Sequence, residues 1–173
     1  MRSLFSRLFG IDDTQESRPS SDTQTVRRIV SEIDQLPLDE GRYIAAFAFV
    51  LSRVANADMN ISREETERME KITREIGGLE EAQALLVVQI AKSQQSLLGG
   101  TENYLVTREF RKIADRKQKE RMLHCLFEVA AADDEISLEE EEEIRRIASE
   151  LGFEHEEFSS FRSKFNDKRV ILR

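Results

Sequence analysis

The stretch V-A-A-A-D-D-E-I-S-L-E-E-E-E-E-I-R-R-I-A-S-E-L-G, residues 129–152, decides the fold because it occurs twice in the chain. The segment 75 residues earlier reads V-A-N-A-D-M-N-I-S-R-E-E-T-E-R-M-E-K-I-T-R-E-I-G, residues 54–77. Of the 24 aligned positions, 12 are identical. Such self-similarity at a fixed offset indicates internal duplication, and we expect one structural unit used twice.

Each copy of the repeat contains the signals that start a helix. Ser62 and Ser137 are placed as N-caps, and Glu65 and Glu140 follow three residues later. A serine and a glutamate at this spacing form a capping box, in which each side chain bonds the backbone N–H of the other residue. The repeat therefore predicts a short turn followed by a capped helix in both copies.

Apolar residues recur at helical spacing before and after each turn, which predicts three helices per copy. The glycines at positions 77 and 152 are expected to end the second helix of each copy, and a third helix is expected over 79–92 and 154–165. The repeats span about 40–92 and 116–166. The predicted fold class is all-α: a compact bundle of about eight helices built from a duplicated three-helix unit.

The composition limits the function classes. The net charge of −8 argues against nucleic acid as a partner. Residues 133–157 carry 12 acidic and 2 basic residues, whereas 104–121 carry 7 basic and 3 acidic.

The single cysteine excludes an internal disulfide and fits a reducing compartment. The longest apolar run, residues 43–51, is half the roughly 20 residues that a spanning helix needs, so we predict a cytoplasmic protein.

The N-terminus is expected to stand apart from a single helical domain over residues 23–173. Residues 1–22 read as a short amphipathic segment followed by a flexible linker. Leu4, Phe5, Leu8 and Phe9 form one apolar side of residues 1–10, and Arg2 and Arg7 add positive charge. This segment can make weak contact with a membrane surface, such as the inner face of the cytoplasmic membrane. Packing on the domain or on a partner protein is the alternative.

The duplicated turn resembles the TerB-like family, whose pattern is A-D-G-x-[I/V]-x-x-x-E between two helices. In this chain it reads A-D-M-N-I-S-R-E-E (57–65) and A-D-D-E-I-S-L-E-E (132–140). The resemblance covers roughly residues 40–165. One departure is that the pattern's glycine is Met59 in one copy and Asp134 in the other. Asp tolerates the left-handed backbone that glycine usually marks better than Met does.

The resemblance implies a non-enzymatic, all-helical domain of a bacterial stress-response system of the tellurite-resistance type. It also implies a protein partner, which can be membrane-associated, and a divalent cation held by the acidic turns. The expected metal ligands are Asp58, Glu65, Asp133 and Glu140. Carboxylate oxygens suit hard cations such as Ca²⁺, Mg²⁺ or Mn²⁺.

The competing hypothesis needs no metal. Acidic residues at a helix start satisfy backbone N–H groups and the helix dipole by themselves. The chain would then be a protein–protein interaction module that uses the acidic C-terminal helix, the basic middle segment or the N-terminal apolar stripe. The glutamate run 139–143 has two interpretations, a solvated helix face or a contact surface for a basic partner. Glu141 with Arg145 and Glu142 with Arg146 are predicted ion pairs four residues apart on this helix.

The histidines and the cysteine give no sign of catalysis. His124 and Cys125 are adjacent on a predicted helix, and adjacent helical positions do not face each other. We expect both to pack in the core and His155 to lie on the surface. No phosphate-binding loop or nucleophile motif is present in the sequence, and we predict that the chain is not an enzyme.

Overall fold

The computed structural model describes residues 28–29, 31–55, 63–93 and 100–170, without the side chains of residues 93, 100–102 and 133. Residues 1–22, including the predicted amphipathic segment, lie outside the described residues. So does the turn of the first repeat, residues 56–62, with Asp58 and the predicted cap Ser62.

The predicted all-α bundle is confirmed for these ranges. A helical stretch at residues 31–35 precedes seven α-helices. Their bounds are α3 Leu38–Ala55, α4 Arg63–Glu75, α5 Glu81–Ser93, α6 Gly100–Ile113, α7 Arg116–Ala130, α8 Leu138–Leu151 and α9 His155–Ser163. Two ends differ from expectation, because α5 begins two residues later than predicted and α9 ends two residues earlier. Among the described residues no helix is both long and apolar enough to cross a membrane.

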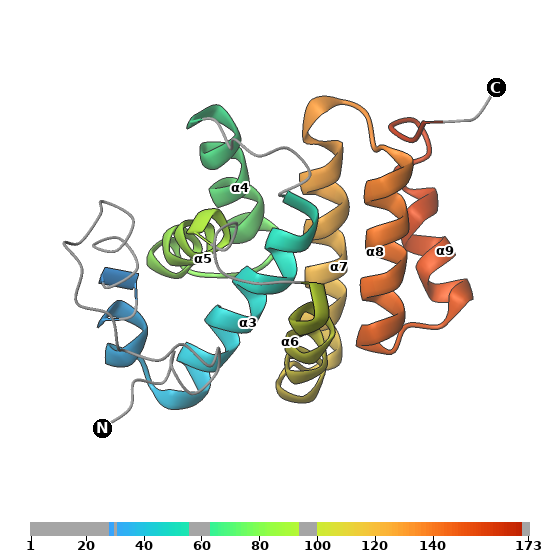
Figure 1. The fold of residues 1–173 in the computed structure, drawn as a ribbon. Coiled ribbons are helices and arrows are strands. Elements are labelled where there is room, and N and C mark those ends of the chain that lie inside the picture. Colours follow the sequence, from blue (N-terminus) through green and yellow to red (C-terminus); the bar gives the residue numbers. More distant parts are fainter. Residues whose placement is uncertain (1–27, 30, 56–62, 94–99, 171–173) are drawn as a thin grey trace.

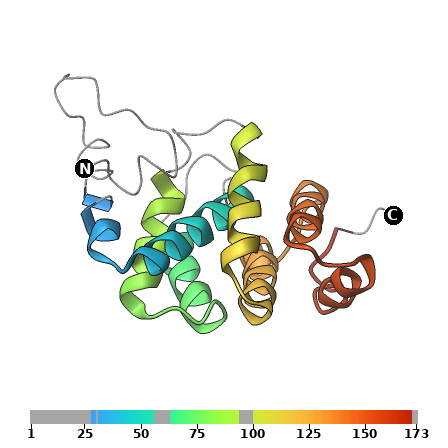
Figure 2. The same ribbon diagram turned by 90° about the horizontal axis from the view of Figure 1, so that it is seen from below.

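The duplication is visible in the order of the helices. Shifted by 75 residues, α3, α4 and α5 correspond to α7, α8 and α9, and α6 joins the two copies. α4 and α5 lie on one side of the molecule and α8 and α9 on the other (Figures 1 and 2). α3 contacts α5, α6, α7 and α8, so it is the centre of the bundle.

The core follows from the apolar pattern of the two central helices. α3 buries nearly every side of its second half, including Ile44, Phe47 and Leu51. α7 buries one face, which includes Leu123 and Phe127. A helix that is apolar all round must be enclosed by other elements, and this explains why α3 occupies the middle of the fold.

The capping box of the second copy forms as predicted. Glu140 N donates to Ser137 Oγ at 3.2 Å, and Ser137 N donates to Glu140 Oε2 at 2.9 Å. α7 has a second capping box that the repeat did not predict. Gln118 N donates to Asp115 Oδ1 at 2.8 Å, and Asp115 N donates to Gln118 Oε1 at the same distance.

The two copies end their second helix differently. Gly152 has φ +88° and ends α8 as predicted, with Phe153 N donating to Ala148 O at 2.9 Å. In the first copy the left-handed residue is Gly78, with φ +71°, and not the predicted Gly77. The sequence offers two consecutive glycines at this point, and either can adopt a positive φ without steric cost.

A buried ion-pair cluster joins the two copies. Arg53, near the end of α3, donates to Glu143 of α8 at 2.7 Å and to Glu150 of α8 at 2.5 Å. It also donates to Thr107 Oγ1 of α6 at 2.7 Å. The Arg53 side chain is only 4% exposed, so its charge is almost fully removed from water. One guanidinium thus connects three helices that lie far apart in the sequence.

We expect Arg53→Ala to lower the free energy of unfolding by about 3–5 kcal/mol, because it leaves two partly buried carboxylates without their partner. Urea unfolding followed by circular dichroism measures the change. Arg63→Ala is the matched control, since Arg63 forms a pair with Glu67 while 92% exposed. Its loss should cost no more than about 0.5 kcal/mol. Equal effects of the two substitutions would contradict the role assigned to Arg53.

Candidate functional site

The turn between α7 and α8 has the left-handed residue that the family pattern predicts. A short 3₁₀ helix, η2, covers Ala131–Asp133. Asp134 follows with φ +67°, at the position where the pattern has glycine. Asp is one of the few residues that adopt this conformation at low cost. The second copy therefore keeps the expected backbone despite the substitution.

Of the four predicted metal ligands, the structure describes the side chains of two. Glu140 Oε2 accepts hydrogen bonds from Ser137 N and from Ser137 Oγ at 2.8 Å. Glu65 is half-buried in the first turn of α4 and also has an interaction partner. Asp58 and the side chain of Asp133 lie outside the description. Within the part that the structure describes, no three His, Cys, Asp or Glu side chains are grouped so as to hold a metal ion.

The turn of the second copy lies beside the first copy. Arg68 of α4 donates to the carbonyl oxygen of Ala132 in η2. α4 also packs against α7. The helix that follows the first acidic turn therefore contacts the second acidic turn directly.

Within the glutamate run, Glu141 binds the C-terminal part of the chain. Arg169 donates to Glu141 through Nε at 2.5 Å and through a terminal nitrogen at 2.8 Å, and Arg162 approaches to 3.4 Å. Burial raises the pKa of Glu141, but the hydrogen bonds and positive charges of Arg169 and Arg162 outweigh it. The net effect is a pKa below the ordinary value of 4.5.

The next two glutamates bind arginines three residues ahead of them. Glu142 accepts from Arg145 at 2.6 Å, and Glu143 accepts from Arg146 at 2.6 Å. The sequence predicted pairs four residues apart, Glu141 with Arg145 and Glu142 with Arg146. That expectation is wrong, because Glu141 faces the C-terminal arginines. Three of the five glutamates of the run are therefore bound to arginines of the chain, and Glu139 and Glu142 are its exposed members.

The basic segment is also partly engaged. Arg116 pairs with Glu120 at 3.0 Å and with Glu157 of α9, and its guanidinium lies 4.3 Å above the ring of Phe153. Arg111 lies against Gly152, where an added Cβ would come within 3.0 Å of the guanidinium carbon. The two oppositely charged segments therefore neutralise each other in part where α6 and α7 meet α8 and α9.

The histidines and the cysteine separate into different environments. Cys125 is buried, and burial followed by the charge of Glu128 raises the pKa of its thiol to about 12. His124 was expected in the core, but its side chain is 40% exposed and lies 3.3 Å from Glu128. Its ring meets Phe165 edge-on at the surface of the core. His155 is exposed at the start of α9 as predicted.

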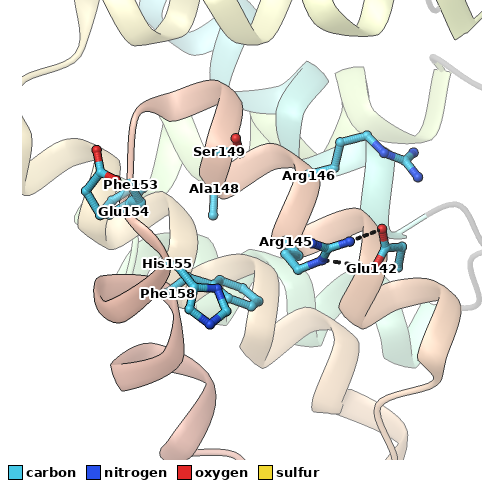
Figure 3. A pocket seen from close by; sticks show the side chains of 9 residues that line it. All are labelled: Glu142, Arg145, Arg146, Ala148, Ser149, Phe153, Glu154, His155 and Phe158. Carbon is cyan, nitrogen blue, oxygen red and sulfur yellow. Dashed lines mark hydrogen bonds and ion pairs between the residues drawn. The ribbon is translucent and has the colours of Figure 1, made fainter.

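A groove between α8 and α9 is a feature that the sequence did not predict. Its volume is about 480 Å³. Ala148, Phe153 and Phe158 form an apolar floor, and all three are buried. Charged and polar side chains form the rim, with Ser149 on α8 and His155 beside Phe158 on α9 (Figure 3). Other rim residues are Glu142, Arg145, Arg146 and Glu154.

The rim carries both signs of charge in internal pairs. Figure 3 shows Arg145 turned toward Glu142 along α8. Glu154 is the N-cap of α9 and forms a capping box with Glu157. The groove therefore has no net excess of either charge, and its buried aromatic floor is its most distinctive chemical feature.

Comparison with known proteins gives one match. The family model described as "Tellurite resistance protein TerB" matches residues 44–163. No curated protein and no solved structure matches the chain.

We expect Glu141→Gln to be less stable than the wild type at neutral pH, with a difference that shrinks as the pH falls. A carboxyl group with a lower pKa in the folded state stabilises the fold above its unfolded pKa. That stabilisation is lost as the pH falls through the folded pKa. Urea unfolding from about pH 7 to about pH 3 measures the difference. Glu139→Gln is the control, since Glu139 is exposed in the same turn. A gap that stays constant below the ordinary pKa of 4.5 would contradict the pairing.

Proposed function

The chain belongs to the TerB family of tellurite resistance proteins, and from this premise we propose that it is a non-enzymatic protein-binding domain of a tellurite-resistance-type stress system. The observation that carries the proposal is the groove between α8 and α9. The groove has a volume of about 480 Å³, and the aromatic side chains of Phe153 and Phe158 line its floor. Protein partners gain most of their affinity by placing a few apolar anchor side chains in such pockets.

The rim favours a protein partner over a small charged ligand. Arg145 and Arg146 already have glutamate partners, so neither presents an unpaired charge toward the groove. A partner that inserts an apolar anchor and surrounds it with polar groups would meet a neutral, hydrogen-bonding rim. Ser149 and His155 supply exposed polar atoms on opposite walls of the groove.

Two features support a non-enzymatic role. The only thiol, Cys125, is buried and has a raised pKa, so it is a poor nucleophile. His124 pairs with Glu128 on its own helix, at the surface. We further propose a cytoplasmic location, with residues 1–10 available for weak contact with the membrane surface.

A divalent-metal site is the second candidate function, and one contact favours it. Arg68 of α4 touches the carbonyl of Ala132, which brings the helix after the first acidic turn to the second one. Glu140 accepts hydrogen bonds from Ser137, and Glu65 lies in the first turn of α4 with a partner of its own. A site at these turns would add the carboxylates of Asp58 and Asp133 to those of Glu65 and Glu140.

We expect Ser149→Trp to abolish tellurite resistance in cells that depend on this chain, because the indole fills the groove. The melting temperature should stay close to that of the wild type, since Ser149 is exposed. Survival on tellurite measures the effect. Ser160→Trp is the matched control, since Ser160 is exposed on α9 and does not line the groove. Full resistance of the Ser149 variant would rule out the groove as the binding surface.

For the metal candidate, we expect a saturable rise in melting temperature when Ca²⁺, Mg²⁺ or Mn²⁺ is added to the EDTA-treated protein. Ligands that bind only the native state raise its apparent stability by mass action. Asp58→Asn and Asp133→Asn should remove the shift, and Glu139→Gln should leave it intact. No shift with any of the three ions would eliminate the metal site and leave the groove proposal untouched.

A further inference from the structure

The C-terminal segment, residues 166–170, returns after α9 and lies against the turn between α7 and α8. Ile136 N donates to Lys168 O at 2.6 Å, and Val170 N donates to Ile136 O at 3.1 Å. The two bonds form a parallel bridge between Ile136 and Arg169. The backbone of Ile136 therefore offers a donor and an acceptor to an extended chain, in the manner of a sheet edge that accepts one more strand.

Two basic side chains of the segment fit two carboxylates of the turn region. Lys168 Nζ lies 2.5 Å from Asp134 Oδ1. Arg169 forms two bonds to Glu141, and Asn166 Oδ1 accepts from a terminal nitrogen of Arg169 at 2.9 Å. Paired bonds between a guanidinium and a carboxylate are geometrically selective as well as strong. Glu141 is only 14% exposed, so this pairing occurs partly out of water.

The left-handed Asp134 helps to shape this surface. Its positive φ reverses the chain between η2 and Ile136, so that its carboxylate and the Ile136 backbone both meet the same extended segment. Lys168 holds the pKa of Asp134 below its ordinary value through a hydrogen bond and its positive charge. The ionised form of Asp134 is therefore the one that meets the segment.

The basic pair is not part of the duplicated unit. In the first copy the residues aligned with Lys168 and Arg169 are Ser93 and Gln94. α5 is still helical at Ser93, whereas α9 has already ended at Ser163 in the second copy. The adjacent Lys and Arg are therefore specific to the sequence of the second copy.

We propose that this surface, formed by Asp134, Ile136 and Glu141, is a recognition slot for an extended peptide of a partner protein that carries adjacent Lys and Arg followed by an aliphatic residue. The chain's own segment 166–170 fills the slot in cis and must be displaced by the partner. The slot recognises its occupant through backbone bonds and two ion pairs, and none of these requires the occupant to belong to the same chain.

The slot is independent of the groove proposed above. It uses the beginning of α8 and the turn before it, whereas the groove is lined by residues from Glu142 onward. A failure of one proposal therefore leaves the other standing.

The test measures binding of a labelled peptide, F-N-D-K-R-V-I-L-R, which copies residues 165–173, by fluorescence anisotropy to full-length protein. The Lys168→Gln/Arg169→Gln chain should bind it about tenfold or more tightly than the wild type, because its resident segment competes less well. Adding Glu141→Gln to this double variant should abolish peptide binding. If that triple variant fails to fold, Asp134→Asn is added to the double variant in its place, and it should also abolish binding. A peptide with Gln at both basic positions should not bind.

Arg63→Gln/Arg74→Gln is the matched control chain, since it removes two exposed arginines of α4, distant from the slot in sequence. It should bind the peptide no better than the wild type does. Equal binding by all chains, or binding that survives both Glu141→Gln and Asp134→Asn, overturns the slot. The proposal is also wrong if the Lys168→Gln/Arg169→Gln chain has no higher affinity for the peptide than the wild type has.

Discussion

The fold depends on one buried cation. Arg53 lies where three helices meet, and its guanidinium binds two glutamates that lie two turns apart on α8. Removing charges from water is costly, and such a cluster is tolerated only when every partner is in place. The Arg53 ion pairs therefore fix the position of α8 against α3. They also fix the turn before α8 and the groove between α8 and α9, because both are built on α8.

The glutamate run shows how the same residue type takes different roles at successive positions. Glu140 closes the helix start, Glu141 holds the C-terminal segment, and Glu143 contributes to the Arg53 cluster. Helical geometry distributes these side chains to different neighbours, because successive positions point about 100° apart. A run that reads as uniform in sequence thus connects three different parts of the molecule.

Much of the fold could be predicted from local pattern. The 75-residue offset predicted the paired helices, and the serine–glutamate spacing predicted the cap of α8. The left-handed turn at Asp134 followed from the glycine position of the family pattern. These features depend on residues close together in the chain, where spacing alone defines the geometry.

What could not be predicted depends on contacts over long separations. Arg53 lies just after the apolar run 43–51, and its partners Glu143 and Glu150 lie 90 and 97 residues away. The groove arises from how α9 lies on α8, which no periodicity in either helix encodes. Pairing within the glutamate run was assigned to the wrong arginines, because the sequence does not show that the C-terminal segment returns to Glu141.

The enclosure of α3 has a consequence for the two copies of the repeat. Under the 75-residue shift α3 corresponds to α7, so the contact between them brings equivalent helices of the two copies together. A single three-helix unit would cover α3 with α5 but would leave the sides of α3 that contact α6, α7 and α8 open to water. Within this chain the α3–α7 contact therefore buries apolar surface of both units at once, and α6 is the segment that connects them.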